Sequence, residues 1–284
     1  MQTVPPTPKF VLEFTKMSGA GNDFIVIDNR FYLFTAEELS GFAARFCPRR
    51  TGVGADGLLG LSVAEGEDAN YRMVYYNADG SLGTMCGNGA RCLARFARDA
   101  GLAAEPLKFE SDAGLYSASV PDDGSDVRLF VPAPEHFKRD LSLGAEFGQG
   151  ELEAHYLWTG TEHIVVFVDD VDSVDIVTIG TQIRRDTTLT PNGANVNFVQ
   201  VESGGHLRVR TFEKGVEAET LACGTGAIAA SLVTAMTGKS SAHRFAVAMR
   251  GGTLFVGFEG SADDPTNLYL EGAASVIYRA TLEL

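Results

Sequence analysis

Cysteine, histidine and basic residues are scarce in this sequence, and it contains no long apolar run. Its 284 residues include four cysteines, five histidines and 23 lysines and arginines against 37 aspartates and glutamates, which gives a formal net charge of −14. A chain this acidic is poorly suited to the phosphates of nucleic acids, so we expect no nucleic-acid partner. No apolar stretch approaches the roughly 20 residues of a membrane span, so we expect no membrane partner.

Signals for export and for metal binding are also missing. The first nine residues, MQTVPPTPK, have no apolar signal-peptide core and predict a short tail outside the fold. Four cysteines without an export signal indicate reduced thiols in the cytoplasm. Cys86 and Cys92 lack a Cys-x-x-Cys spacing, and no histidine pair is spaced to complete a zinc site, so we expect no metal.

A Cys-Gly-x-Gly-Ala motif occurs twice in the chain. One copy begins at Cys86 and the other at Cys223, 137 residues later (223 − 86), and each runs straight into a helical pattern. The two patterns predict helices at about residues 88–100 and 225–237, ended by Gly101 and Gly238. A matched motif before each helix favours two similar halves over a chance likeness between two β-rich segments.

The remaining pattern is mostly that of short strands. Alternating apolar residues predict strands at 14–17, 24–27, 71–76, 127–131, 163–168, 197–201 and 207–212. Residues 35–46 predict a further helix, because Thr35 and Glu38 fit a capping box in front of an apolar face.

The order of these parts repeats along the chain. Polar loops at 18–22 and 159–163 occupy matching places, and each is followed by strands and then by a Cys-Gly helix. The repeat predicts an α+β fold of two pseudo-symmetric halves, each a curved, mostly antiparallel sheet around a central helix. We expect the first half to cover residues 1–132, with 273–284 returning to it, and the second half to cover 133–272.

The position of Cys86 and Cys223 at helix starts points to acid–base chemistry. A helix N-terminus offers unpaired N–H groups that bind anions, and glycines let a ligand approach them closely. A cysteine at such an end has its thiolate favoured. Two thiols on opposite faces of one carbon can remove a proton and return one with inversion, so no cofactor is required and we expect none.

The chain resembles the diaminopimelate epimerases. The resemblance rests on five motifs, MSGAGNDF (17–24), GVGADG (52–57), YNADGS (76–81), CGNGARC (86–92) and ETLACGTG (219–226). It implies the two-half fold, and cofactor-independent interconversion of LL- and meso-diaminopimelate on the route to lysine and peptidoglycan precursors. It also implies a small-molecule substrate, and a homodimer as in some members of the family.

The resemblance also assigns roles by position. It implies that Cys86 and Cys223 are the catalytic pair, and that His163 and Glu213 tune their ionisation. The substrate-binding residues that it implies are Asn22, Asn77, Gly87, Asn88, Asn195, Glu213, Lys214, Gly224 and Thr225.

Four positions depart from the family's usual pattern. Lys214 stands where arginine is usual, so the charge is kept but the bidentate fork is lost. Thr161 and Glu162 replace the residues that usually precede the histidine, and Glu162 adds a negative charge. Gly57 stands where some members carry a glutamine. The distal end of the substrate is where these departures would act.

Other interpretations of these residues remain open. Cys47 and Cys92 are expected to be buried core residues. Residues 52–57 match G-x-G-x-x-G, but a strand pattern follows them, so we expect a turn and no dinucleotide site. The function could also be that of a related two-thiol racemase of another amino acid, or that of a non-catalytic protein that binds small anions. A disulfide between Cys86 and Cys223 is expected only as an oxidised, inactive form.

Overall fold

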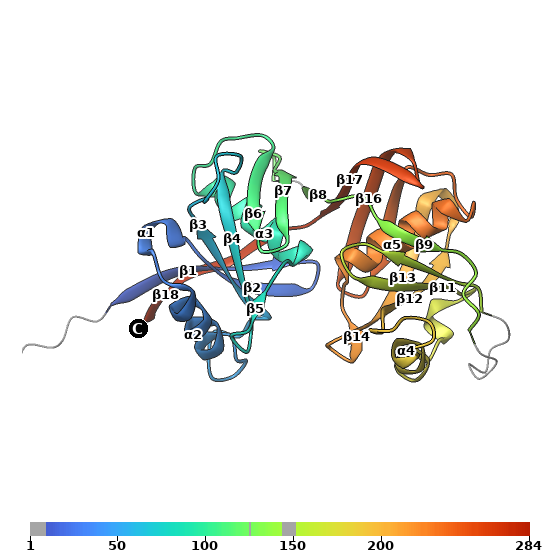
Figure 1. The fold of residues 1–284 in the computed structure, drawn as a ribbon. Coiled ribbons are helices and arrows are strands. Elements are labelled where there is room, and N and C mark those ends of the chain that lie inside the picture. Colours follow the sequence, from blue (N-terminus) through green and yellow to red (C-terminus); the bar gives the residue numbers. More distant parts are fainter. Residues whose placement is uncertain (1–9, 125, 144–151) are drawn as a thin grey trace, which may run out of the picture.

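The computed structural model describes residues 10–124, 126–143 and 152–284. The expected N-terminal tail, residues 1–9, lies outside the described residues. Figure 1 shows two lobes, each with a curved sheet around a helix, α3 (Gly87–Asp99) in one lobe and α5 (Gly224–Met236) in the other. The predicted α+β fold of two similar halves is therefore confirmed.

The first lobe is built on a mostly antiparallel sheet. Its strands are β1 (Val11–Gly19), β2 (Asn22–Ile27), β3 (Gly57–Ser62), β4 (Tyr71–Asn77), β5 (Leu82–Gly83), β6 (Leu107–Ser111), β7 (Gly114–Ser119) and β8 (Val127–Phe130). Two short connecting helices are α1 (Asn29–Tyr32) and α2 (Ala36–Phe46). The last strand of the chain, β18 (Ser275–Glu283), pairs antiparallel with β1, and Figure 1 shows it beside the blue N-terminal strand.

The second lobe repeats this plan. Its strands are β9 (Glu135–Lys138), β10 (Ala154–Trp158), β11 (Glu162–Phe167), β12 (Asn195–Val201), β13 (His206–Glu213), β14 (Ala218–Thr220), β15 (Arg244–Met249), β16 (Gly252–Ser261) and β17 (Asp264–Gly272). The connecting helices are η2 (Val171–Ser173), α4 (Ile176–Arg185) and η3 (Ser203–Gly205).

The strand pairing shows the internal symmetry directly. In the first lobe β2 pairs parallel with β3, β3 antiparallel with β4, and β4 parallel with β6. In the second lobe β11 pairs parallel with β12, β12 antiparallel with β13, and β13 parallel with β15. Strand β8 pairs with both β7 and β17, so the two sheets are joined at that strand.

The two central helices end in the same way. The N–H of Leu102 donates to the carbonyl of Ala97, and that of Lys239 to the carbonyl of Thr234, both at 3.0 Å. Each bond closes a Schellman turn around a glycine with positive φ, at the two stops that the sequence predicts. Both helices are largely buried within their sheets, where replacing a buried leucine by alanine costs about 2–5 kcal/mol. Each thiol is therefore carried on the start of a rigid core element.

The capping box predicted for the third helix is present. Thr35 is the N-cap of α2, its hydroxyl accepts from the N–H of Glu38, and the Glu38 carboxylate accepts from the N–H of Thr35 at 2.8 Å. Such a cap stabilises a helix by about 1 kcal/mol. After α2, residues 52–57 turn directly into β3, so the expectation of a turn and a strand there is confirmed.

Candidate active site

Cys86 and Cys223 occupy equivalent positions at the starts of the two central helices. Each is the N-cap residue of its helix and has an extended backbone. The Cys86 sulfur accepts a hydrogen bond from the N–H of Gly89 at 3.5 Å, and the Cys223 sulfur lies 3.5 Å from the Thr225 hydroxyl. Both thiols therefore stand over a first helical turn whose N–H groups can hold an anion.

The first turns of the two helices pack against one side chain. A Cβ placed on Gly87 would lie 3.4 Å from Cδ2 of Leu270, and one placed on Gly224 would lie 2.8 Å from the same atom. Helices α3 and α5 also contact each other. The starts of the two central helices therefore both lie against one leucine, and at Gly224 a side chain would crowd it.

The polar loop of the first lobe reaches across to the second cysteine. A Cβ on Gly21 would lie 3.1 Å from Cβ of Leu221 and from Cα of Gly251. Leu221 precedes Cys223 by two residues, and Asn22 follows Gly21. The loop that carries Asn22 thus lies against the segment that leads into the second thiol.

Three asparagines of the first lobe lie in this region. Asn88 Nδ2 donates to Asn22 Oδ1 at 2.7 Å, and Asn22 Nδ2 donates to Asp56 Oδ2 at 2.9 Å. Asn77 is partly exposed at the end of β4, and its Oδ1 accepts from the Tyr75 hydroxyl at 2.9 Å. The structure therefore joins Asn22 and Asn88 directly, whereas Asn77 belongs to a separate contact with Tyr75.

Tyr75 fills the space that Gly57 leaves open. A Cβ on Gly57 would lie 2.7 Å from Cε2 of the Tyr75 ring. Burial raises the pKa of Tyr75, and the negative charges of the Cys86 thiolate and of Glu213 act in the same direction. The phenol therefore lies in the electrostatic neighbourhood of the site, at one of the positions where the sequence departs from the family pattern.

The second lobe contributes a buried polar group around His163. Asn195 Oδ1 accepts from the backbone N–H of Lys214 at 2.8 Å, and Asn195 Nδ2 lies 3.5 Å from His163 Nε2. The hydroxyl of Thr159 donates to the carbonyl of Thr225 at 3.0 Å, which ties the 159–163 loop to the first turn of α5. His163, Asn195, Lys214 and Thr225 are thus held by contacts among β11, β12, β13 and α5.

Asn197 is the nearer of two amides that face the His163 ring. The Asn197 amide is oriented by two partners, because its Oδ1 accepts from the Thr211 hydroxyl and its Nδ2 donates to the carbonyl of Ile164. Nδ2 also lies 2.9 Å from His163 Nδ1, whereas Asn195 Nδ2 faces Nε2 at 3.5 Å. Burial lowers the pKa of His163 to about 3, so the ring is neutral, and the shorter contact favours Nδ1 as the acceptor.

Burial outweighs the helix N-terminus at both thiols. Burial raises the pKa of Cys86, although the N–H of Gly89 and the charge of Arg91 act against it. Burial and the negative charge of Glu213 raise the pKa of Cys223 to about 12. The N–H groups of the helix starts do favour the thiolate at both cysteines, as expected from the sequence, but burial is the larger effect and raises the pKa of both thiols.

Glu213 is electrostatically close to both thiols. Its charge raises the pKa of Cys86 as well as that of Cys223, and burial raises the pKa of Glu213 itself. Cys47 and Cys92 are buried in the core, as predicted, and all four cysteines are free.

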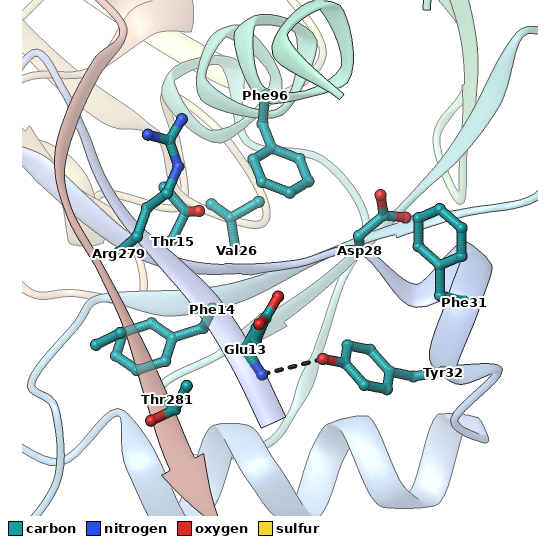
Figure 2. Close-up of a pocket in the computed structure, with 11 residues that line it drawn as sticks. Glu13, Phe14, Thr15, Val26, Asp28, Phe31, Tyr32, Phe96, Arg279 and Thr281 are labelled. Carbon is teal, nitrogen blue, oxygen red and sulfur yellow. Dashed lines mark hydrogen bonds between the residues drawn. The ribbon is translucent and has the colours of Figure 1, made fainter. Parts of the chain in front are cut away.

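A pocket beside the N-terminal strand lies away from the two helix-start cysteines. Its volume is about 690 Å³, and neither Cys86 nor Cys223 lines it. Figure 2 shows it between β1, β18 and the α1 region, with side chains such as Phe31, Phe96 and Arg279 around it. Within the described ranges, no group of three His, Cys, Asp or Glu side chains is placed to hold a metal ion. No helix of the described residues is long and apolar enough to cross a membrane.

Comparison with known families agrees with this arrangement. The sequence profile of one family, described as diaminopimelate epimerase, matches residues 14–132 and 155–277. The chain belongs to the diaminopimelate epimerase family. A diaminopimelate epimerase of Chlorobaculum tepidum is 44% identical over 273 residues, covering 94% of this chain and 100% of the relative. One from Aquifex aeolicus is 36% identical over 279 residues, covering 95% and 98%.

Solved structures with low sequence identity share the fold of this diaminopimelate epimerase family member. A phenazine biosynthesis protein of the PhzF family from Bacillus anthracis superposes with a TM-score of 0.70 at 18% identity, covering 97% of this chain and 100% of that one. A hydroxyproline epimerase from Agrobacterium vitis, solved with bound trans-4-hydroxy-L-proline, superposes with a TM-score of 0.69 at 16% identity, covering 97% and 92%.

The sequence alone did not identify two buried polar residues of this diaminopimelate epimerase family member, Asn197 and Arg91. Asn197 follows Asn195 at a spacing of two in an apolar strand, so both side chains face the same side of β12. The two-residue spacing from Asn195 is the feature of the sequence that could have indicated Asn197. Arg91 lies inside the CGNGARC motif, and its complete burial is visible only in the folded protein.

Proposed function

We propose that this chain interconverts LL- and meso-diaminopimelate, with Cys86 and Cys223 as the acid and the base. The observation that carries the proposal is that both cysteines cap helices whose first turns meet at Leu270. Membership of the diaminopimelate epimerase family supplies the substrate. The two thiols then approach one α-carbon from opposite sides.

Each turnover moves one proton off the substrate and another onto it. One cysteine, as the thiolate, takes the α-proton, and the C–H electron pair passes into the carboxylate. The N–H groups of the two helix starts stabilise the negative charge that develops there. The opposite thiol donates its proton to the other face of the carbon, so the two sulfurs end with exchanged protonation states.

The raised pKa values require a local acceptor for the first proton. Glu213 acts on both thiols and is itself shifted upward by burial, which brings a carboxylate closer to a thiol in basicity. His163 is neutral and buried in the second lobe, where its Nδ1 already faces the amide of Asn197, so it is a poor proton acceptor. We therefore assign Glu213 the task of accepting the thiol proton when substrate enters, and His163 a part in setting the ionisation of the thiols.

The ends of the substrate are assigned to the asparagines and to the glycine turns. Gly87, Asn88, Gly224 and Thr225 form the first turns that hold the reacting carboxylate. Side chains of Asn22, Asn77, Asn195, Glu213 and Lys214 hold the amino groups and the distal carboxylate. No cofactor takes part in these steps.

The experiment that tests the proposal is α-proton exchange in heavy water. Reduced wild-type protein, Cys86→Ala, Cys223→Ala and the control Cys47→Ala are incubated with LL-diaminopimelate, and deuterium and stereochemistry are followed together. We expect deuterium in meso product with wild type and with Cys47→Ala, and none with either of the other variants. Absence of exchange in freshly reduced wild type would remove diaminopimelate as the substrate.

We also propose a homodimer that uses β18. In a sheet one face of a strand is normally buried, yet residues 275–281 are all exposed, including Val276, Ile277 and Tyr278. The pocket in Figure 2 borders the same strand. Sedimentation of wild type as a dimer and of Ile277→Glu as a monomer is the expected result; a monomeric wild type contradicts it.

For the chain as a whole, we propose two folding units and a cytoplasmic location. The units are residues 1–132 together with 273–284, and residues 133–272. Four free cysteines, two of them required for chemistry, suit a reducing compartment. Limited proteolysis followed by mass spectrometry tests the unit boundaries, since the first cuts should fall near residues 132–134.

A further inference from the structure

Arg91 is a buried cation that lacks a carboxylate partner. It is 0% exposed and is the largest fully buried side chain among the described residues. Its guanidinium donates to Asn88 Oδ1 at 2.7 Å and to the carbonyl of Gly87 at 3.4 Å. Within the described ranges its Nε has no hydrogen-bond partner and no carboxylate lies within ion-pair distance. Burying a charge is unfavourable unless it is paired and hydrogen-bonded, and among the described contacts only two hydrogen bonds offset the desolvation.

The guanidinium begins a hydrogen-bond chain with a fixed direction. Arginine can only donate, so Asn88 must turn its Oδ1 toward Arg91 and its Nδ2 toward Asn22. Asn22 then turns its own Nδ2 toward the carboxylate of Asp56, which can only accept. The chain from Arg91 through Asn88 and Asn22 to Asp56 therefore has no second orientation for either amide.

The hydrogen-bond chain leaves each of the two amides with one N–H group that can donate to a ligand. Within the described contacts, Asn88 Nδ2 and Asn22 Nδ2 each use one of their two N–H groups. Asn88 lies in the first turn of α3, two residues after Cys86. The Asn88 amide therefore lies at a helix start that can hold an anion, with the Asn22 amide of β2 hydrogen-bonded to it. A carboxylate oxygen is a suitable acceptor for a spare amide N–H.

We propose that Arg91 is a positioning residue of the substrate site, which acts by locking the Asn88 amide and, through it, the Asn22 amide in the orientations that bind the substrate. This inference rests on the proposed function. The guanidinium also places a positive charge one turn inside the N-terminus of α3, where it adds to the helix dipole in attracting an anion. Gly272 at the end of β17 lies beside the guanidinium, since a Cβ there would be in van der Waals contact with Nη2 at 3.4 Å.

The competing explanation is that Arg91 serves only the packing of α3. The two explanations differ in what a substitution does to ligand binding. If Arg91 only packs, Arg91→Met changes stability and leaves the affinity of the folded protein alone. If Arg91 positions the amides, Arg91→Met weakens binding while the protein remains as stable as before, because an uncompensated buried charge has been removed.

The test compares Arg91→Met with the control Arg95→Met. The control also removes one guanidinium from α3, but Arg95 contacts Asp99 and the carbonyl of Pro121, not Asn88. We expect KM for diaminopimelate to rise about tenfold in Arg91→Met, as for loss of a charge-assisted hydrogen bond, and to stay within about twofold in Arg95→Met. Arg91→Lys, which keeps the charge and a donor, should recover part of the loss. An unchanged KM in Arg91→Met overturns the inference.

A double-mutant cycle with Asn22→Ala shows whether Arg91 acts through the chain. In the Asn22→Ala background, Arg91→Met should cost clearly less than it costs in wild type, because the terminal amide is already gone. Full additivity of the two effects contradicts the proposed route.

A readout without turnover separates failure of this inference from failure of the proposed function. The side-chain amide signals of Asn88 and Asn22 in NMR spectra of the ligand-free protein should shift and exchange faster with water in Arg91→Met, and not in Arg95→Met. If wild type shows no epimerisation but these signals respond, the proposed function fails and the positioning role stands. If the signals stay as in wild type, Arg91 does not position these amides.

Discussion

The ammonium of Lys214 lies 2.5 Å from Oε2 of Glu162, and the pair joins the end of β13 to the start of β11. Both side chains are largely shielded, with 24% and 21% of their surface exposed. Burial is the largest single influence and would raise the pKa of Glu162, but the hydrogen bond and charge of Lys214, a backbone N–H and the Thr161 hydroxyl together lower it. Two positions that depart separately from the family pattern therefore form one neutralised unit.

The Glu162–Lys214 ion pair leads to a prediction about the KM for diaminopimelate, because Glu162 competes with the distal carboxylate of the substrate for Lys214. Glu162→Gln removes the competing carboxylate and frees Lys214 for the substrate. We expect KM for diaminopimelate to fall about two- to fivefold, the range of a partly exposed ion pair, and to rise in Lys214→Met. Steady-state kinetics at low and high salt measure the effect, which should shrink as salt screens the charges.

Thr161 offers a matched control for this pair. Its hydroxyl donates to the same Glu162 oxygen at 3.2 Å, so Thr161→Val removes a contact of Glu162 without changing any charge. We expect KM to change less in Thr161→Val than in Glu162→Gln. A higher KM in Glu162→Gln would mean that Glu162 helps to hold the substrate and does not compete with it.

We predict that Glu213 lowers the reactivity of Cys86 and Cys223 toward alkylation. Burial is the main cause of the raised pKa of Cys86 and Cys223, and the charge of Glu213 adds to it at each. Glu213→Gln should therefore lower both pKa values, so the thiolate fraction at a given pH increases. We expect iodoacetamide to alkylate both cysteines faster at pH 8 than in wild type, while epimerisation falls.

Peptide-resolved mass spectrometry supplies the internal reference for that experiment. Burial raises the pKa of Cys47 to about 12, and the charges that act on it are those of Lys16, Asp23, Asp56 and Arg49. Its alkylation should not respond to Glu213→Gln. Equal acceleration at Cys47 would indicate general loosening of the fold, and unchanged rates at Cys86 and Cys223 would remove Glu213 from their electrostatics.

The sequence was enough to predict the two central helices and the cysteines at their starts. The Cys-Gly motif, the glycine stops and the 137-residue repeat (223 − 86) locate both central helices, because caps and helix ends depend on neighbouring residues. The Asn197–His163 contact could not be predicted in the same way. It joins residues 34 positions apart and depends on how β12 is registered against β11.

The ionisation of the thiols also lay beyond the sequence. A helix start favours a thiolate, whereas burial disfavours it, and only the fold shows which effect is larger. Burial prevails at Cys86 and Cys223. The burial of Arg91 could not be predicted from the sequence either, because it depends on how α3 packs against β17.

His163 predicts an acid sensitivity of the fold. Burial lowers its pKa to about 3 from an ordinary value of 6.5, so the unfolded chain binds the extra proton between these two pH values. This contribution to stability is complete above pH 6.5 and is lost as the pH falls, with a slope of up to about 1.4 kcal/mol per pH unit. Urea unfolding between pH 4 and pH 7 should show a shallower decline in His163→Gln; parallel curves would contradict the buried neutral state.

The internal repeat supplies a matched pair of glycine substitutions. Gly89 and Gly226 are the third residues after Cys86 and Cys223. A Cβ on Gly226 would lie 2.3 Å from Asn197 Oδ1 and 3.2 Å from the Cys223 sulfur, whereas a Cβ on Gly89 would lie 3.2 Å from a terminal carbon of Leu59. The second lobe thus places a fixed amide where the first lobe places an adaptable leucine.

Gly226→Ala should therefore be the more damaging of the two changes. Displacing Asn197 breaks its bonds to His163 and Thr211, and overpacking of this kind costs about 1–3 kcal/mol, against about 1 kcal/mol or less where a leucine can move. We expect a lower urea midpoint and a large loss of α-proton exchange in Gly226→Ala, and near-normal values in Gly89→Ala. Equal losses in the two variants would mean that the first turn of each helix, and not the Asn197–His163 pair, sets the requirement for glycine.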